Sequence, residues 1–249
     1  MKHKNTIVNR IKLGLELALL HHGSRMFGPT QFLLSTATII SIASIILETV
    51  QEFTAFSEWF MVIEWTAAGI FTLEYLARLW IESKKMGYVF GFWGIADLLS
   101  ILPTFLGLGN WTFLKSVRTL RMLRLLRMIR LAKISRSYLQ SHDQANTQGD
   151  MNKINVSIYF LALTSVTIVF GSILYGVEQA NGAYANIPLA MLQVARVLVG
   201  GVGFAPTSSV FGEVIILLIR FVGLALFGFL VSIIGGILNH WLLGTEKSK

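Results

Sequence analysis

The sequence contains no cysteine and few charged side chains. Without cysteine, its 249 residues can form no disulfide, no cysteine-ligated zinc site and no cysteine nucleophile. Charged residues make up 14% of the chain, whereas a soluble domain carries about 25%. The histidines lie near the termini or in loops and form no metal-ligand grouping (His3, His21, His22, His142 and His240). The sequence therefore gives no support for an enzyme or a resident metal site.

The sequence is instead rich in apolar residues, which make up 54% of it and come in long runs. A helix needs roughly 20 apolar residues to cross a hydrocarbon core ~30 Å thick. The runs predict an all-α membrane protein with six transmembrane helices, near 30–51, 59–81, 93–109, 112–136, 154–177 and 213–243. A further apolar stretch, 187–204, begins with Ile187-Pro188 and ends in VGGVGFAP. It predicts a half-membrane helix followed by an extended loop.

Basic residues in the predicted loops set the orientation. Several lie before the first crossing or at the end of the second, and none occurs between Gln51 and Ala77. The positive-inside rule then places both termini in the cytoplasm. The first residues lack the uninterrupted apolar core of a signal peptide because Glu16 interrupts it. We expect segment 1–29 to form an amphipathic helix on the cytoplasmic membrane face, with the apolar side Ile7, Val8, Ile11, Leu15 and Leu19.

The fourth predicted crossing carries a basic residue at every third position. These residues are Lys115, Arg118, Arg121, Arg124, Arg127, Arg130, Lys133 and Arg136. Each step of three turns an α-helix through about 300°, so the charges wind slowly around it, and a 3₁₀ helix would align them in a stripe. Each charge that crosses a membrane potential of 100 mV contributes about 2.3 kcal/mol. The pattern therefore favours a voltage-sensing helix.

Two other interpretations of this segment compete with a sensor. A basic helix lying on anionic lipid or nucleic acid would gather its charges on one face. A cytoplasmic stop-transfer run would not be interleaved with Leu, Ile and Met. The apolar interleaving and the spans on both sides oppose both interpretations.

Acidic residues in the neighbouring crossings could stabilise these charges. Glu64 and Glu74 lie in the second crossing, Asp97 in the third and Glu48 near the outer end of the first. Phe71 precedes Glu74 by three residues and shares its helix face. For Glu48, a helix-end carboxylate at the headgroup level is an equally good interpretation.

The second crossing, E-W-T-A-A-G-I-F-T-L-E-Y-L-A-R, and the third, F-W-G-I-A-D-L-L-S-I-L-P, resemble voltage-gated potassium channels. The resemblance runs from about residue 31 to 240 and implies a four-helix voltage sensor over 30–136. It implies a charge-transfer centre capped by Phe71, with Glu74 and Asp97 on the inner side. Glu48 and Glu64 would act on the outer side, and Pro103 would bend the third helix. The implied sensing residues are Arg118, Arg121, Arg124, Arg127, Arg130 and Lys133.

The sequence N-I-P-L-A-M-L-Q-V-A-R-V-L-V-G-G-V-G-F-A-P resembles the pore helix and selectivity filter of the same family. The family filter is T-V-G-Y-G, whose carbonyl and hydroxyl oxygens replace the water shell of the ion. The matching residues here are Gly201, Val202, Gly203, Phe204 and Ala205.

This match departs from the family pattern. Gly201 lacks the threonine hydroxyl, and Ala205 replaces a glycine that tolerates a left-handed backbone. Leu192 and Gln193 replace paired tryptophans. Arg196 adds a cation to the pore helix, either to pair with Glu178 or Glu213 or to discourage cations near the filter. These departures predict weakened potassium selectivity.

The last crossing resembles the pore-lining helix of prokaryotic members, which implies the inner membrane of a bacterium. Gly223 takes the hinge position, and Leu230 replaces a common proline near the gate. The resemblance divides the rest of the chain into a linker (137–153), a pore domain (154–243) and a cytoplasmic tail (244–249). Polar residues of the linker, including Asn146, Gly149 and Asp150, predict a loop.

The sequence predicts a voltage-gated, potassium-channel-like cation channel. We expect it to form a homotetramer in a lipid bilayer. We expect a permeant monovalent cation, K+ by resemblance, and no cofactor, nucleic acid or small-molecule substrate. A voltage-sensing protein with a non-selective or non-conducting pore module is the alternative. A secondary transporter would show duplicated halves, which the sequence lacks.

Overall fold

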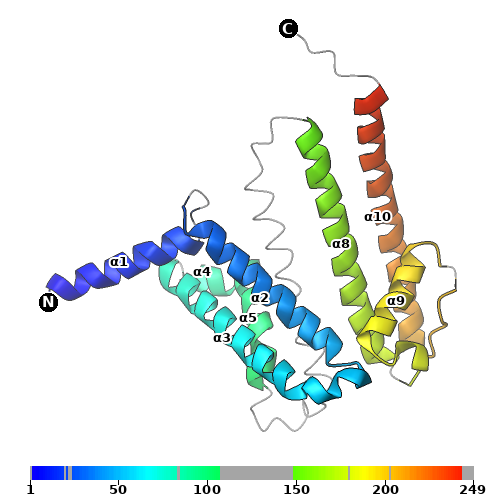
Figure 1. Ribbon diagram of the computed structural model, residues 1–249, viewed down its shortest axis with the longest axis horizontal. Helices are drawn as coiled ribbons and strands as arrows, with labels where there is room; N and C mark the ends of the chain where they lie inside the picture. The colour runs from blue at the N-terminus through cyan, green and yellow to red at the C-terminus, as the bar shows by residue number, and fades with distance from the viewer. Residues whose placement is uncertain are drawn as a thin grey trace. The chain divides into compact units, whose positions relative to one another are not determined.

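The computed structural model describes residues 2–19, 21, 24–82, 85–106, 148–178, 180–201 and 203–242 (Figure 1). Over these ranges the chain forms helices joined by turns and loops, with no strand among them. The expectation of an all-helical chain is confirmed for this part of the protein. The chain divides into two compact units, Met1–Ile134 and Ser135–Lys249, and each is described by itself.

The first unit contains the elements expected for the N-terminal segment and the first three crossings. They are α1 (Lys2–Leu19), α2 (Phe27–Leu47), a 3₁₀ helix (Gln51–Phe56), α3 (Ser57–Ile81), α4 (Lys85–Val89) and α5 (Phe92–Leu106). Pro103 lies inside α5. The end of the third predicted crossing and the whole basic crossing 112–136 lie outside the described residues.

Two apolar clusters hold the helices of the first unit together. Leu19 of α1 packs with Leu34 of α2 and Ile81 of α3. Ala67 and Phe71 of α3 pack with Ile101 of α5. The small side chains of Ala67 and Ala68 are buried on α3, and small residues let helices approach closely inside a membrane.

The second unit contains α8 (Gln148–Val177), a short 3₁₀ helix (Gly182–Tyr184), α9 (Ile187–Leu198) and α10 (Val210–Leu242). Helices α8 and α10 run side by side, and α9 lies beside the end of α8 and the start of α10 (Figure 1). Glycine permits close packing at two of these contacts. A Cβ at Gly171 of α8 would lie 2.7 Å from Met191 Cγ of α9, and one at Gly223 of α10 would lie 3.3 Å from Leu198 Cδ2.

The prediction of a loop throughout 137–153 is wrong for its last residues. Helix α8 begins at Gln148, six residues before the predicted crossing, so Gly149 and Asp150 are helical. A glycine inside a helix costs only about 1 kcal/mol, which the continuation of a long helix can offset. Residues 137–147 lie outside the described part of the chain.

Four helical segments among the described residues are long and apolar enough to cross a membrane: Phe27–Leu47, Gln51–Ile81, Ile154–Val177 and Val210–Asn239. They agree with the first, second, fifth and sixth predicted crossings. Many large apolar side chains on these helices are exposed, including Phe32 and Leu73 in the first unit and Phe221 in the second. A soluble protein rarely exposes so much apolar surface, so these faces suit lipid or partner helices.

Candidate functional site

Three acidic side chains and one aromatic ring are buried on two packed helices of the first unit. Glu64 and Glu74 on α3 and Asp97 on α5 are buried, and the Phe71 side chain is fully inaccessible to solvent. Phe71 follows Glu64 by seven residues and precedes Glu74 by three, so the three side chains share one face of α3. The ten-residue separation of the two glutamates corresponds to about 15 Å along the axis. An apolar layer therefore lies between two acidic levels.

Each of these carboxylates contacts a described polar side chain. Thr104 Oγ1 donates a hydrogen bond to Glu64 Oε1 at 2.9 Å. Arg78 Nη2 lies 2.7 Å from Glu74 Oε1, one helical turn away. These contacts hold the carboxylates in place, which a buried charge requires.

Asp97 is held by a side chain of the short helix α4. Tyr88 donates its hydroxyl proton to Asp97 Oδ2 at 2.7 Å. Burial and the nearby Asp97 carboxylate raise the pKa of Tyr88 well above its ordinary value, so the phenol remains a donor. Asp97 therefore stays oriented by a neutral partner.

The other predicted sensor residues fall into two groups. Glu48 directly follows the last residue of α2 and is half-buried, so it lies at a helix end. The sensing residues Arg118, Arg121, Arg124, Arg127, Arg130 and Lys133 lie outside the described residues. Of the predicted sensor, the described structure places Glu64, Phe71 and Glu74 on one face of α3 and buries Asp97 on α5.

The predicted filter lies in the loop between α9 and α10. Asn186 caps α9, since its Oδ1 accepts a hydrogen bond from Leu189 N at 2.8 Å. The helix has 12 residues, about 18 Å, and the chain then leaves helical structure as predicted. Gly200, Gly201 and Gly203 have φ angles of 128°, 75° and 70°, which only glycine adopts readily. Val202 lies outside the described residues.

Ala205 has an ordinary backbone conformation. No described residue other than glycine has a positive φ, so Ala205 does not adopt the left-handed conformation that glycine tolerates and alanine disfavours. Ala205 N donates to Gln193 Oε1 at 2.9 Å, and Tyr184 donates its hydroxyl to Ala205 O at 2.7 Å. The two hydrogen bonds fix an ordinary backbone conformation.

Arg196 contacts the loop itself. Its Nη1 donates a hydrogen bond to Gly203 O at 2.9 Å. Neither expected ion pair, with Glu178 or with Glu213, is found among the described residues. The Gly203 carbonyl therefore points toward a guanidinium of its own chain.

Glu178 joins the end of α8 to the start of α10. Its carboxylate accepts hydrogen bonds from Ser208 N at 2.6 Å, from Ser209 N at 3.0 Å and from the Ser209 hydroxyl. Ser209 Oγ in turn accepts a hydrogen bond from Gly212 N at 2.9 Å and so caps α10. Burial raises the pKa of Glu178, but the bonds from Ser209 and Ser208 outweigh it and leave the pKa below its ordinary value.

Comparison with protein families shows to which family the chain belongs. The family model described as "ion transport protein" matches residues 29–243, most of the chain. The chain belongs to the ion transport protein family. No curated protein matches the sequence. The match supports a voltage-gated-type ion channel in a membrane rather than an enzyme.

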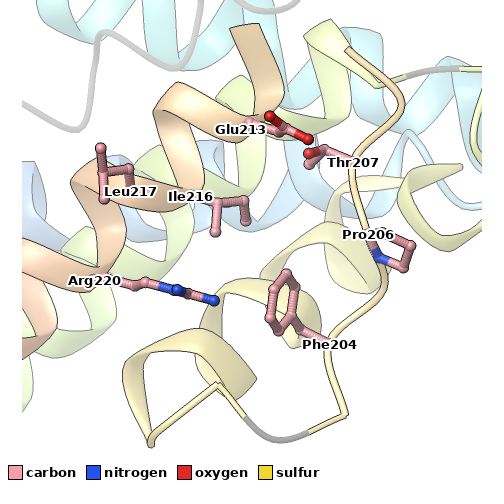
Figure 2. Close-up of a pocket in the computed structure, with 7 residues that line it drawn as sticks. All are labelled: Phe204, Pro206, Thr207, Glu213, Ile216, Leu217 and Arg220. Atoms are coloured by element: carbon pink, nitrogen blue, oxygen red, sulfur yellow. The ribbon is translucent and has the colours of Figure 1, made fainter. Parts of the chain in front are cut away.

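A second arginine lies near the loop of this ion transport protein. The Arg220 guanidinium carbon lies 5.5 Å from the centre of the Phe204 ring, a cation–π contact. The two side chains line a pocket of about 280 Å³ with Pro206, Thr207, Glu213, Ile216 and Leu217 (Figure 2). In this view the guanidinium extends from α10 toward Phe204.

The two predicted gate residues lie within one uninterrupted helix. Gly223 is buried where α10 approaches Leu198, and Leu230 is half-buried farther along α10. The close approach gives a packing reason for glycine at 223. A hinge role for Gly223 and Leu230 stays a prediction.

Sequence reasoning missed several residues that hold the loop between α9 and α10. Ser209 carried a usable signal, because a serine directly before a long apolar run predicts a helix N-cap. Asn181 Nδ2 donates to Pro206 O at 2.9 Å, but these residues lie 25 positions apart. Tyr184 contacts Ala205 over 21 positions. No local pattern identifies such partners.

Proposed function

We propose that this chain is a subunit of a voltage-gated cation channel of the potassium-channel type. The observation that carries the proposal is the buried order of acid, aromatic and acid along one face of α3, with Asp97 on α5. Family membership and four membrane-length helical segments support it. The sensing charges would be Arg118, Arg121, Arg124, Arg127, Arg130 and Lys133.

In this mechanism the arginines pass Phe71 one at a time. Glu64 stabilises a charge on one side of the ring, and Glu74 with Asp97 stabilises it on the other. The buried ring excludes water, so the membrane potential falls over a short distance around it. Three charges that cross 100 mV supply about 7 kcal/mol per subunit, enough to bias a gate strongly.

The second unit would form the pore with those of other subunits. A half-membrane helix and a glycine-rich loop suit an ion path, because irregular backbone at membrane depth must border protein or water. We propose a homotetramer in a bacterial inner membrane with both termini cytoplasmic. The permeant ion would be a monovalent cation.

The experiment is voltage clamp of the purified protein in planar bilayers, with potassium on one side and sodium on the other. We expect a voltage-dependent current, and Arg124→Gln or Arg127→Gln should shift or flatten its voltage dependence. Arg10→Gln, at an exposed position of α1, is the matched control and should behave like the wild type. Unchanged gating-charge curves in both sensor variants would refute the sensor.

A second candidate is a voltage-sensing protein whose pore does not conduct. The hydrogen bond from Arg196 to the Gly203 carbonyl favours it, because that oxygen is already engaged by a cation. Fluorescent labels on the sensor would then report voltage-dependent movement while the bilayer stays silent. A reversal potential near that of potassium would exclude this candidate.

A further inference from the structure

The pore loop already has a positive charge at one of its carbonyl groups. In a cation filter, backbone carbonyl oxygens replace the hydration water of the ion. Here Arg196 Nη1 donates to Gly203 O at 2.9 Å, the position and charge that a bound cation would supply. A Cβ at Gly203 would meet nothing within 4 Å, and the carbonyl of this residue accepts the hydrogen bond from Arg196.

Arg220 supplies a second positive charge on the α10 side of the loop. It lies over the Phe204 ring, and a Cβ at Gly201 would be 3.9 Å from Arg220 Nη2. The side chain therefore reaches both Gly201 and Phe204 from one helix. Arg196 reaches Gly203 from α9, so guanidinium groups approach the loop from two helices.

The end of α9 is a second place where a cation would be stabilised. The C-terminus of a helix carries a partial negative charge of about half an electron. The residues that end α9 and begin the loop, 197–201, line a pocket of about 510 Å³ together with Arg220. Arg220 thus places a fixed positive charge where the helix end favours a mobile one.

We propose that Arg196 and Arg220 act as tethered cations that determine the ion specificity of this loop. By donating to the Gly203 carbonyl and by lining the pocket at the end of α9, they lower the affinity of the loop for monovalent cations. The inference rests on the proposed function, since it takes the loop as part of the ion path. It adds two residues that set which ions the path accepts.

The test measures potassium binding directly and needs neither current nor voltage. Purified wild type, Arg196→Gln, Arg220→Gln and the double variant are titrated with KCl against choline chloride at constant ionic strength, by calorimetry and by melting temperature. We expect little potassium-specific stabilisation of the wild type. Each glutamine variant should bind potassium at least about tenfold more tightly than the wild type does. Arg10→Gln should match the wild type.

Arg196→Lys is the charge-conserving control for Arg196→Gln. Lysine keeps a positive charge that can donate to the carbonyl, so this variant should bind potassium as weakly as the wild type. If Arg196→Gln does not fold, Arg220→Gln carries the test, because Arg220 lies exposed on α10. Strong potassium-specific stabilisation of the wild type, or equal potassium affinity in the wild type and the folded glutamine variants, would overturn the proposal.

A bilayer measurement separates this inference from the proposed function. In a KCl gradient, the glutamine variants should increase the permeability of potassium relative to chloride. If the current is voltage-dependent but the permeability ratio is the same in the wild type and the glutamine variants, the tethered cations are refuted. The proposal of a channel is then unaffected. Tighter potassium binding in the variants, with no current from any of them, supports the tethered cations and refutes the channel.

Discussion

An added methyl group at Gly212 should strongly destabilise the second unit. A Cβ at this position would overlap Glu178 Oε1 and would lie 2.9 Å from Thr207 Cβ. Gly212→Ala therefore forces Glu178 Oε1 away from Ser209, whose N–H and hydroxyl both donate to it. Hydrogen bonds to a charged group contribute about 1.5–3 kcal/mol each, and these two would be lost.

The expected cost follows from these terms. The lost bonds remove roughly 3–6 kcal/mol, and alanine returns about 1 kcal/mol of helix propensity. A net loss of about 3 kcal/mol lowers the melting temperature of a chain of this size by about 6–12 °C. The assay is thermal unfolding of the purified protein in detergent, followed by intrinsic fluorescence.

Gly228→Ala is the matched control, because it makes the same chemical change in the same helix. A Cβ at Gly228 meets nothing within 4 Å, so this variant should melt at or slightly above the wild-type temperature. Equal melting temperatures for the two variants would refute the role of Glu178 as the link between α8 and α10.

The remaining predictions concern packing and pH. Gly171→Ala should destabilise the second unit by about 1–3 kcal/mol, because the new Cβ would lie 2.9 Å from backbone atoms of Met191. Rescue of the melting temperature by Met191→Ala would contradict this backbone clash. The pKa of Glu178 is lowered in the folded protein, so its contribution to stability is present above its ordinary pKa of 4.5 and is lost as pH falls below that value. Glu178→Gln should therefore weaken the dependence of melting temperature on pH in this range, and an unchanged dependence would count against the hydrogen-bonded carboxylate.

Periodic patterns predicted the helices well, because long apolar runs leave the backbone few alternatives in a membrane. Each of the four membrane-length segments overlaps a predicted crossing. The start of α8 was missed for a physical reason. Gly149 and Asp150 have low helix propensity, but propensity is a weak guide where a long helix continues through them.

The acidic residues of the first unit were predicted from their positions in the apolar crossings and from the family resemblance, whereas their partners were not. The positions of Glu64, Phe71 and Glu74 on one helix place them on one face whatever the fold. Thr104 is 40 residues from Glu64, and its hydrogen bond depends on how α5 packs against α3. Contacts of this range follow from tertiary structure and leave no local signature.

The residues that depart from the family motif in and beside the loop between α9 and α10 compensate for one another. Gln193, which replaces a tryptophan of the family, accepts a hydrogen bond from Ala205 N. The Tyr184 hydroxyl donates a hydrogen bond to the carbonyl oxygen of Ala205. Because Ala205 is held at negative φ, it needs no glycine. Arg196 donates a hydrogen bond to the carbonyl oxygen of Gly203, and the positive φ at this position requires glycine. Each of these backbone groups therefore has a polar partner within the chain, and the substitutions form one consistent arrangement.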